Sequence, residues 1–261
     1  MTSRVRVLTW NLWWRFGPAW QERQPHIRDT LREADPDIAA LQEVWGADGT
    51  SQAHELAEAL GHHAAYAQPA LPPAPGDPEH AGVDVGLGLV SRWPITTWEA
   101  VRMPARYRKP TVALRATVAH PDGPLHVLVA CLEWEPAFQE DRHAQAHRLA
   151  GLAADPTLDG PVPVVVAGDL NAAPDSPVLR PLPAAGLVDA WSAAGGDPAA
   201  ATLSSAHPHA PMEAAELIDK RIDHVFARPG HAGQRLLFER AVLAGDADAS
   251  DHQAVVCDIA W

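Results

Sequence analysis

The spacing of apolar residues along the chain changes between the two-residue period of a strand and the wider spacing of a helix. Alternation over residues 4–11 predicts a half-buried strand with Asn11 at its tip. Other apolar runs predict strands at residues 37–44, 85–92, 95–101, 111–118, 125–132, 162–171, 220–228, 234–244 and 252–261. The four runs between residues 85 and 132 are expected to form one antiparallel set.

Helical spacing occurs in four segments, which start or end at recognisable signals. They are the segment from Pro18 to Pro36, residues 51–60 with Ser51 as N-cap, residues 138–154 and residues 177–194. Two Ala/Pro-rich loops are expected at residues 64–82 and 197–211. Long loops within a compact domain are often functional.

The composition predicts one domain of the α/β class over residues 1–261. The chain is 47% hydrophobic, which is enough for a well-buried core. We see no export signal and no apolar run of roughly 20 residues that could span a bilayer. Cys131 and Cys257 are too few for a disulfide framework, so we expect the reducing cytoplasm as the location. We also expect a monomer.

The net charge of −13 argues against a protein that binds nucleic acid by general attraction to its phosphates. A polyanionic substrate would need a local patch of positive charge. One stretch without acids offers five cations, at Arg102, Arg106, Arg108, Lys109 and Arg115. This stretch is either a surface that contacts a phosphodiester such as nucleic acid or a solvated basic loop.

Polar side chains stand at the ends of the predicted strands. They are Asn11, Glu43, Asp169, Asn171, Asp223, Asp251 and His252. Each alone is also what a turn or a helix cap uses. As a set, they combine carboxylates, amides and one imidazole in a chain with no G-x-x-x-x-G-K loop and no G-x-S-x-G elbow. Oxygen ligands favour Mg²⁺ or Mn²⁺, completed by a substrate phosphate.

Six motifs that contain these residues follow one another along the chain. They are TWNLWW, DIAALQEVW, GLVSRWPI, GDLNAAPDS, RIDHVF and SDHQAVV. In this order and approximate spacing, from Val5 to Ile259, they resemble the endonuclease/exonuclease/phosphatase family with its deoxyribonuclease I-like fold. The resemblance implies a four-layer α/β sandwich of two mainly antiparallel sheets packed face to face, with helices outside and the site at one rim.

The resemblance also implies a role for each polar residue. The metal-binding set would be Asn11, Glu43 and Asp251. Asp169 would activate the attacking water, and Asn171 would orient the phosphate. Asp223 would align the imidazole of His252, which hydrogen-bonds or protonates the phosphoryl group. Asp219 lies in the same segment, but the R-I-D context favours Asp223.

The sequence departs from the family pattern at one strand end. Many members have a second histidine in a T-H-L tripeptide, where this chain has A-C-L with Cys131 at its centre. Cys131 is either a structural filler or a substitute group on the phosphate side, which leaves the leaving-group step open. We expect His224 to pack in the core and His207 and His209 to lie in a solvated loop.

The function that fits these residues is a metal-dependent phosphodiesterase of the nuclease type, which hydrolyses phosphoester bonds of DNA or RNA with an activated water. One alternative is a phosphomonoesterase or lipid-headgroup phosphodiesterase, motivated by the acidic surface and the tryptophan-rich residues 10–20. Another is a non-catalytic binding protein on the same fold, to which the missing histidine gives weight.

Overall fold

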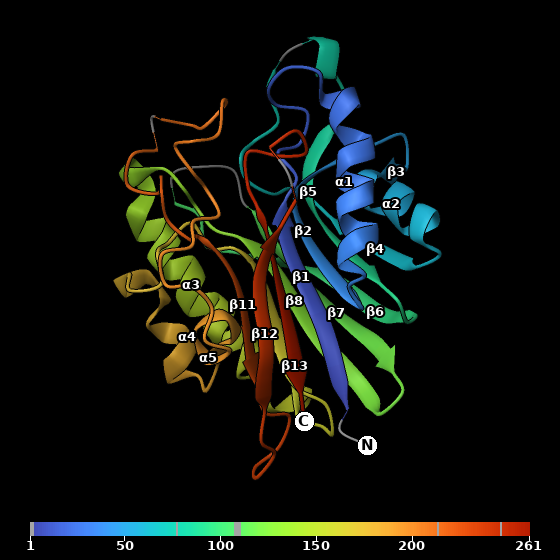
Figure 1. The fold of residues 1–261 in the computed structure, drawn as a ribbon, viewed down its shortest axis with the longest axis vertical. Helices are drawn as coiled ribbons and strands as arrows, with labels where there is room; N and C mark the ends of the chain where they lie inside the picture. Colours follow the sequence, from blue (N-terminus) through green and yellow to red (C-terminus); the bar gives the residue numbers. More distant parts are fainter. Residues whose placement is uncertain (1–2, 77, 107–110, 213, 246) are drawn as a thin grey trace.

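The computed structural model describes residues 3–76, 78–106, 111–212, 214–245 and 247–261, and their strands form two sheets (Figure 1). The order in the first sheet is β12 (Leu237–Ala244), β13 (Ala254–Ala260), β1 (Arg4–Asn11), β2 (Ile38–Ala47), β5 (Asp84–Ser91) and β4 (His63–Ala67), and β3 (Thr50–Ser51) pairs with β2. The order in the second sheet is β10 (Val188–Asp189), β11 (Asp223–Arg228), β9 (Val164–Asp169), β8 (Gly123–Cys131), β7 (Val112–His120) and β6 (Ile95–Arg102).

Both sheets are mainly antiparallel, as expected. Each contains one parallel pair, β1 with β2 in the first sheet and β8 with β9 in the second. The two parallel pairs lie in the middle of their sheets, and the connection within each pair contains a helix.

Helices cover the outer face of each sheet. The described α-helices are α1 (Trp20–Ala34), α2 (Gln52–Leu60), α3 (Gln139–Ala153), α4 (Pro181–Ala184) and α5 (Ala190–Ala193), with short 3₁₀ helices at Pro78–His80, Pro136–Phe138, Pro156–Leu158 and Pro177–Leu179. α5 is the exception, because its Ala190 and Trp191 pack into the core between the sheets. α1 and α2 pack on the first sheet through Ile27, Leu31 and Leu56. α3 and α4 pack on the second through Leu149 and Leu182, on the opposite side of the molecule (Figure 1). This confirms the expected four-layer sandwich. None of the described helices is long and apolar enough to cross a membrane.

The main core lies between the two sheets, and the two faces of β1 pack into two different hydrophobic cores. Val5 and Val7 point into the core between the sheets, whereas Leu8 and Trp10 point into the cluster beneath α1. The strand is therefore buried on both faces over most of its length, rather than half-buried as its alternation indicated. The reason is that α1 covers the face that a two-layer protein would leave to solvent.

Two expectations about strands were wrong. The start of the predicted loop at residues 64–82 is a strand, because β4 pairs antiparallel with β5 and buries Ala65 and Ala67. The small alanine side chains carried no strand signal. The expected antiparallel set of four strands is also split between the sheets, because β5 pairs with β2 and β4 while β6, β7 and β8 pair with one another.

The helix predicted at residues 177–194 was wrong as well. The segment contains a 3₁₀ helix, α4, the short strand β10 and α5. Pro181 and Pro183 supply no backbone N–H to extend the helix towards its N-terminus, and Gly186, with φ 82°, turns the chain after α4. Helical spacing of apolar residues survives because Leu179, Leu182 and Leu187 still face one cluster.

Candidate active site

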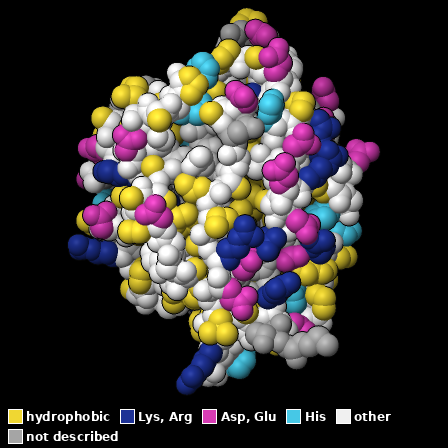
Figure 2. All heavy atoms as spheres, in the orientation of Figure 1, with side chains coloured by type: hydrophobic (Ala, Val, Ile, Leu, Met, Phe, Trp, Pro, Cys, Tyr) yellow, Lys and Arg dark blue, Asp and Glu magenta, His cyan; other side chains and the backbone are white. Residues whose placement is uncertain are grey.

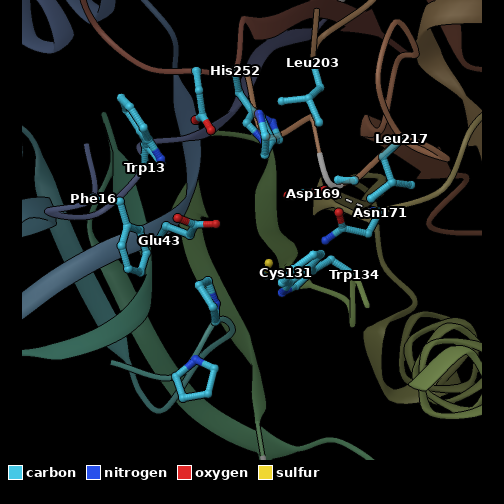
Figure 3. A pocket seen from close by; sticks show the side chains of 15 residues that line it. Trp13, Phe16, Glu43, Cys131, Trp134, Asp169, Asn171, Leu203, Leu217 and His252 are labelled. Atoms are coloured by element: carbon cyan, nitrogen blue, oxygen red, sulfur yellow. Dashed lines mark hydrogen bonds between the residues drawn. The ribbon is translucent and has the colours of Figure 1, made fainter. Parts of the chain in front are cut away.

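Strand ends from both sheets place the predicted polar residues around one cavity. Asn11 is the last residue of β1, Asp169 the last of β9 and Asp223 the first of β11. Because β11 runs antiparallel to β9, Asp223 stands opposite Asp169 in the register. The cavity measures about 310 Å³, and both the carboxylate of Glu43 and the imidazole of His252 line it (Figure 3).

The side-chain amide of Asn11 joins carboxylates that come from different sheets. Its Nδ2 donates to Glu43 Oε1 at 2.9 Å and to Asp169 Oδ2 at 3.1 Å. Its Oδ1 accepts the backbone N–H of Trp13 at 2.9 Å. The hydroxyl of Ser250 donates to the backbone carbonyl of Asn11 at 2.7 Å, which ties the end of β1 to the segment before β13. Asn11 therefore fixes the spacing of the acidic groups across the gap between the sheets.

Glu43 lies at an irregularity inside β2, whereas we expected it at the end of that strand. The pairing with β5 shifts register between Leu41 and Val44, and Glu43 has a φ of 49°. A bulge of this kind re-aims a side chain, and a left-handed non-glycine residue costs about 1–3 kcal/mol. Burial, followed by the negative charge of Asp251, raises the pKa of Glu43 to about 8.

Asp169 and Asn171 form a tight turn at the end of β9. The backbone N–H of Asn171 donates to Asp169 Oδ1 at 3.0 Å, and Asn171 has a φ of 47°. Its side-chain Nδ2 donates to the carbonyl of Leu132 at 2.9 Å, while Arg142 donates to its backbone carbonyl at 2.7 Å. Burial, followed by the charge of Asp223, raises the pKa of Asp169 to about 7. A carboxylate with this pKa is matched to accepting a proton near neutral pH.

Asp223 and His252 form a buried pair next to Asp169. His252 Nδ1 and Asp223 Oδ2 are 2.9 Å apart. Burial opposes the imidazolium, but the charge and hydrogen bond of Asp223 and the charges of Asp251 and Asp169 outweigh it, so the pKa of His252 is well above its usual value. Because Nδ1 is engaged, Nε2 is the nitrogen left to act on a ligand. The other oxygen of Asp223, Oδ1, is buried and has no hydrogen-bond partner among the residues that the structure describes.

The donor set fits a divalent cation. Burial raises the pKa of Asp251, as it does for Glu43 and Asp169, so the carboxylates of this cavity need a counter-charge. Oxygen donors of this kind suit a hard cation. Among the described residues, Asp169, Asp223 and His252 offer possible ligand atoms that all lie within 4.8 Å of one another. Of the set that the resemblance implied, Glu43 and Asp251 line the same cavity and Asn11 is bonded to Glu43.

Cys131 lines the cavity, at the strand end where many members of the family have a histidine. It stands opposite Asp169 in the pairing of β8 with β9. Burial and the charges of nearby carboxylates raise the pKa of its thiol well above the usual value. The side chain is therefore a neutral group that cannot replace the charge of an imidazolium.

The other residues considered from the sequence lie outside this cavity. His224 is buried and its Nε2 is 2.8 Å from the carbonyl oxygen of Ala172, as expected for a core residue. Asp219 is exposed and accepts hydrogen bonds from Ser205. His207 and His209 lie in the predicted loop, where both rings contact Trp13.

The predicted basic stretch does not line the cavity in the part that the structure describes. Arg106 pairs with Glu140 at 2.7 Å. Arg102 is exposed at the end of the edge strand β6, and Arg115 pairs with acidic neighbours. Arg108 and Lys109 lie outside the described residues. On the face shown in Figure 2, basic side chains are scattered among acidic ones rather than joined into one basic surface.

Sequence reasoning missed one residue that organises the site, Arg23 of α1. Its guanidinium is buried and donates to five backbone carbonyls, at Leu12, Trp13, Trp14, Phe16 and Ala249. These carbonyls belong to the segment after β1 and to the segment before His252. An arginine in a helix is normally expected to face solvent, so the local sequence gives no signal of this role.

Comparison with known proteins agrees with the geometry. The sequence profile of the endonuclease/exonuclease/phosphatase family matches residues 8–252. A search among curated proteins found no match.

Solved structures with the same fold cover 98% of this chain. An endonuclease/exonuclease/phosphatase from Beutenbergia cavernae has 24% identity and a TM-score of 0.70, over 71% of that chain. A humanized TDP2 of D. rerio has 17% identity and a TM-score of 0.76, over 98% of that chain. The catalytic domain of human Nocturnin, solved with a bound sulfate anion, has 22% identity and a TM-score of 0.70, over 94% of that chain. At these identities the likeness shows the fold.

Proposed function

Because the chain belongs to the endonuclease/exonuclease/phosphatase family, we propose that it is a divalent-metal-dependent phosphodiesterase of the nuclease type. The observation that carries the proposal is the buried Asp169 carboxylate. It is held by Asn11 and Asn171, stands beside the Asp223–His252 pair and lines the cavity. A D. rerio TDP2 of the same fold has been solved with a single-strand DNA product, which supports a phosphodiester of nucleic acid as the substrate class.

In the proposed reaction, Asp169 takes a proton from a water molecule as the water oxygen attacks phosphorus. The bond from phosphorus to the leaving oxygen breaks, and that oxygen takes a proton from solvent. His252, kept cationic by Asp223, donates a hydrogen bond from Nε2 to a phosphoryl oxygen, and Asn171 helps to orient the phosphate. No covalent intermediate with the protein is needed.

Asn11, Glu43 and Asp251 would hold Mg²⁺ or Mn²⁺, which supplies positive charge opposite the charge that develops on the phosphoryl oxygens. The bulge turns the side chain of Glu43, and the amide of Asn11 hydrogen-bonds to both Glu43 and Asp169. These side chains therefore have their positions before any ligand binds. Such preorganisation is what holds catalytic groups in productive geometry. A non-catalytic protein would have no use for a water-activating acid placed next to ligands of this kind.

The test is a panel of phosphoesters incubated with EDTA-treated protein, with and without added Mg²⁺ or Mn²⁺. The panel contains single- and double-stranded DNA, RNA, sphingomyelin, inositol phosphates and bis-p-nitrophenyl phosphate. We expect metal-dependent cleavage of phosphodiesters, and a loss of about 10²–10³ in rate for Asp169→Asn. Cleavage without metal, or an Asp169→Asn protein as active as the wild type, would refute the proposal.

A further inference from the structure

The cavity above the acidic residues has walls that the proposed chemistry does not use. One wall is the segment that comes directly after β1 of the first sheet in the sequence, and it contains Trp13 and Phe16. The other is the segment directly after β8 of the second sheet, and it contains Trp134. Figure 3 shows the first pair on the side of Glu43 and Trp134 beside Cys131. The remaining apolar lining residues are Pro72, Pro73, Leu203, Pro211, Ala214 and Leu217.

Both walls are built into the fold rather than left as loose surface loops. Arg23 donates to the carbonyls of Trp13, Trp14 and Phe16, and its guanidinium carbon lies 4.8 Å from the centre of the Trp13 ring. Trp134 packs against a small buried cluster that includes Leu203. A backbone held by Arg23 and rings that already pack against neighbours limit the entropy that is lost when a ligand binds between the walls.

The charge of the cavity limits what can enter. Glu43, Asp169 and Asp251 line it, and no lysine or arginine does so among the residues that the structure describes. A bound cation and His252 would balance one negative charge on the substrate more readily than two. The cavity therefore suits the monoanion of a phosphodiester better than the dianion of a phosphomonoester.

The size and shape of the cavity limit the uncharged part of the substrate. A volume of about 310 Å³ is at the small end for ligand pockets and matches a phosphate with one ring-sized group. Aromatic walls favour flat rings, because offset-stacked and edge-to-face contacts add attraction beyond the burial of apolar area. The Trp13 ring already contacts Arg23 and the ring of His209, so stacking on a ligand falls mainly to Trp134.

Resting on the proposed function, we propose that the walls formed by Trp13, Phe16 and Trp134 are a subsite for one flat, uncharged ring carried by an ester group of a monoanionic phosphodiester. An aryl ester and a nucleobase share this chemistry. The subsite places that ring beside the phosphorus, so it selects small aromatic phosphodiesters, or the end of a strand, over phosphomonoesters and alkyl phosphodiesters.

The experiment measures how well four small phosphates inhibit hydrolysis of bis-p-nitrophenyl phosphate by the Mg²⁺-loaded protein. They are dimethyl phosphate, methyl phenyl phosphate, methyl cyclohexyl phosphate and phenyl phosphate. We expect methyl phenyl phosphate to bind at least ~10-fold more tightly than dimethyl phosphate, the range that stacking of one ring supplies. The cyclohexyl ester, of similar size but not flat, and the dianionic phenyl phosphate should bind more weakly than methyl phenyl phosphate. In a parallel series, thymidine 5′-monophosphate methyl ester should resemble the phenyl ester.

Variants connect the preference to the walls. Trp134→Ala should bring the ratio of the phenyl to the methyl inhibition constant close to one, and Trp134→Phe should restore most of it. Trp98 is exposed on β6 and is the matched control, because Trp98→Ala removes a tryptophan that does not line the cavity and should keep the wild-type ratio.

The inhibition constants either support or overturn the ring subsite. Equal inhibition by the methyl and phenyl esters, or a preference for the cyclohexyl ester or for phenyl phosphate, overturns the subsite even if phosphodiesters are hydrolysed. If Trp134→Ala does not fold, the wild-type series still decides. If the wild type hydrolyses no phosphodiester, the proposed function fails. Calorimetric titration of the same four phosphates then shows separately whether the ring subsite exists.

Discussion

The buried carboxylate of Glu43 makes a specific prediction about stability and pH in the absence of metal. Burial and the charge of Asp251 raise the pKa of Glu43 to about 8, from 4.5 in an unfolded chain. Between these two values the folded protein holds a proton that the unfolded chain has released. The free energy of unfolding of the metal-free protein must therefore fall as pH rises through this window, and the loss is complete only above about pH 8.

The informative part of the window lies between pH 6.5 and 8. Below this range, His224 opposes the effect of Glu43. Burial and the charge of Arg221 lower the pKa of His224 to about 4, so its titration makes the free energy of unfolding rise with pH. Between pH 6.5 and 8, ionisation of Glu43 alone should lower the free energy of unfolding by about 2 kcal/mol, at about 1.4 kcal/mol per pH unit. That corresponds to about 5 °C in melting temperature for a chain of this size. The raised pKa values of Asp169 and His252 add to the fall in the same direction.

The assay is thermal unfolding in EDTA at pH 6.5 and pH 8, for the wild type and for Glu43→Gln. Glutamine keeps an oxygen that can accept the Asn11 hydrogen bond but does not titrate, so the variant should lose the share of the fall that belongs to Glu43. Added Mg²⁺ should raise the melting temperature of the wild type more at pH 8 than at pH 6.5, since the cation binds the ionised carboxylate. A melting temperature in EDTA that is constant or rises with pH, or an equal fall in both proteins, would refute this reasoning.

Three further predictions follow from other parts of the site. Asp223→Asn removes the charge that raises the pKa of His252 but keeps an oxygen that can accept the hydrogen bond from Nδ1. The alkaline limb of the kcat profile should therefore move to lower pH, and kcat should fall by about 10²–10³; an unmoved limb in a pH series would contradict it. Cys131→Ser should change kcat by less than about tenfold, and the buried neutral thiol should react slowly with iodoacetamide at pH 8; rapid alkylation would contradict it. Arg23→Met leaves five backbone carbonyls without their donor, so it should lower the free energy of unfolding, measured in urea, by about 3 kcal/mol or more. It should also raise KM, because the wall that contains Trp13 is displaced. A loss of stability below about 1 kcal/mol would show that other donors satisfy the carbonyls.

Local patterns were sufficient for most strands of this fold and insufficient for their assignment to sheets. β1, β2, β9 and β13 are runs of apolar residues bounded by turn residues, and each was found. β4 was missed because its alanines resemble the loop that follows. The separation of β5 from β6 depends on pairing partners that no local pattern encodes. The false helix at residues 177–194 shows the converse, since apolar spacing persisted after prolines had ended the helix.

For the site, the sequence was informative where a polar residue follows an apolar strand. Asp169 and Asp223 were recognisable in this way, and the register between β9 and β11 brings them together. What the sequence could not show were contacts between distant segments. The hydroxyl of Ser250 bonds to the carbonyl of Asn11 across 239 positions, and Arg23 bonds to Ala249 across 226. The inward turn of Glu43 depends on a bulge that appears only when β2 pairs with β5.

The central claim is that Asp169 and His252 act as one unit on a phosphodiester, and a double-mutant cycle tests it most directly. Initial rates of bis-p-nitrophenyl phosphate hydrolysis in Mg²⁺ would be measured for the wild type, Asp169→Asn, His252→Gln and the double variant. Residues that work as a unit lose most of the rate when either is removed, so the double variant should be about as slow as the slower single variant. Two single variants with wild-type rates, or losses that multiply fully in the double variant, would contradict the claim.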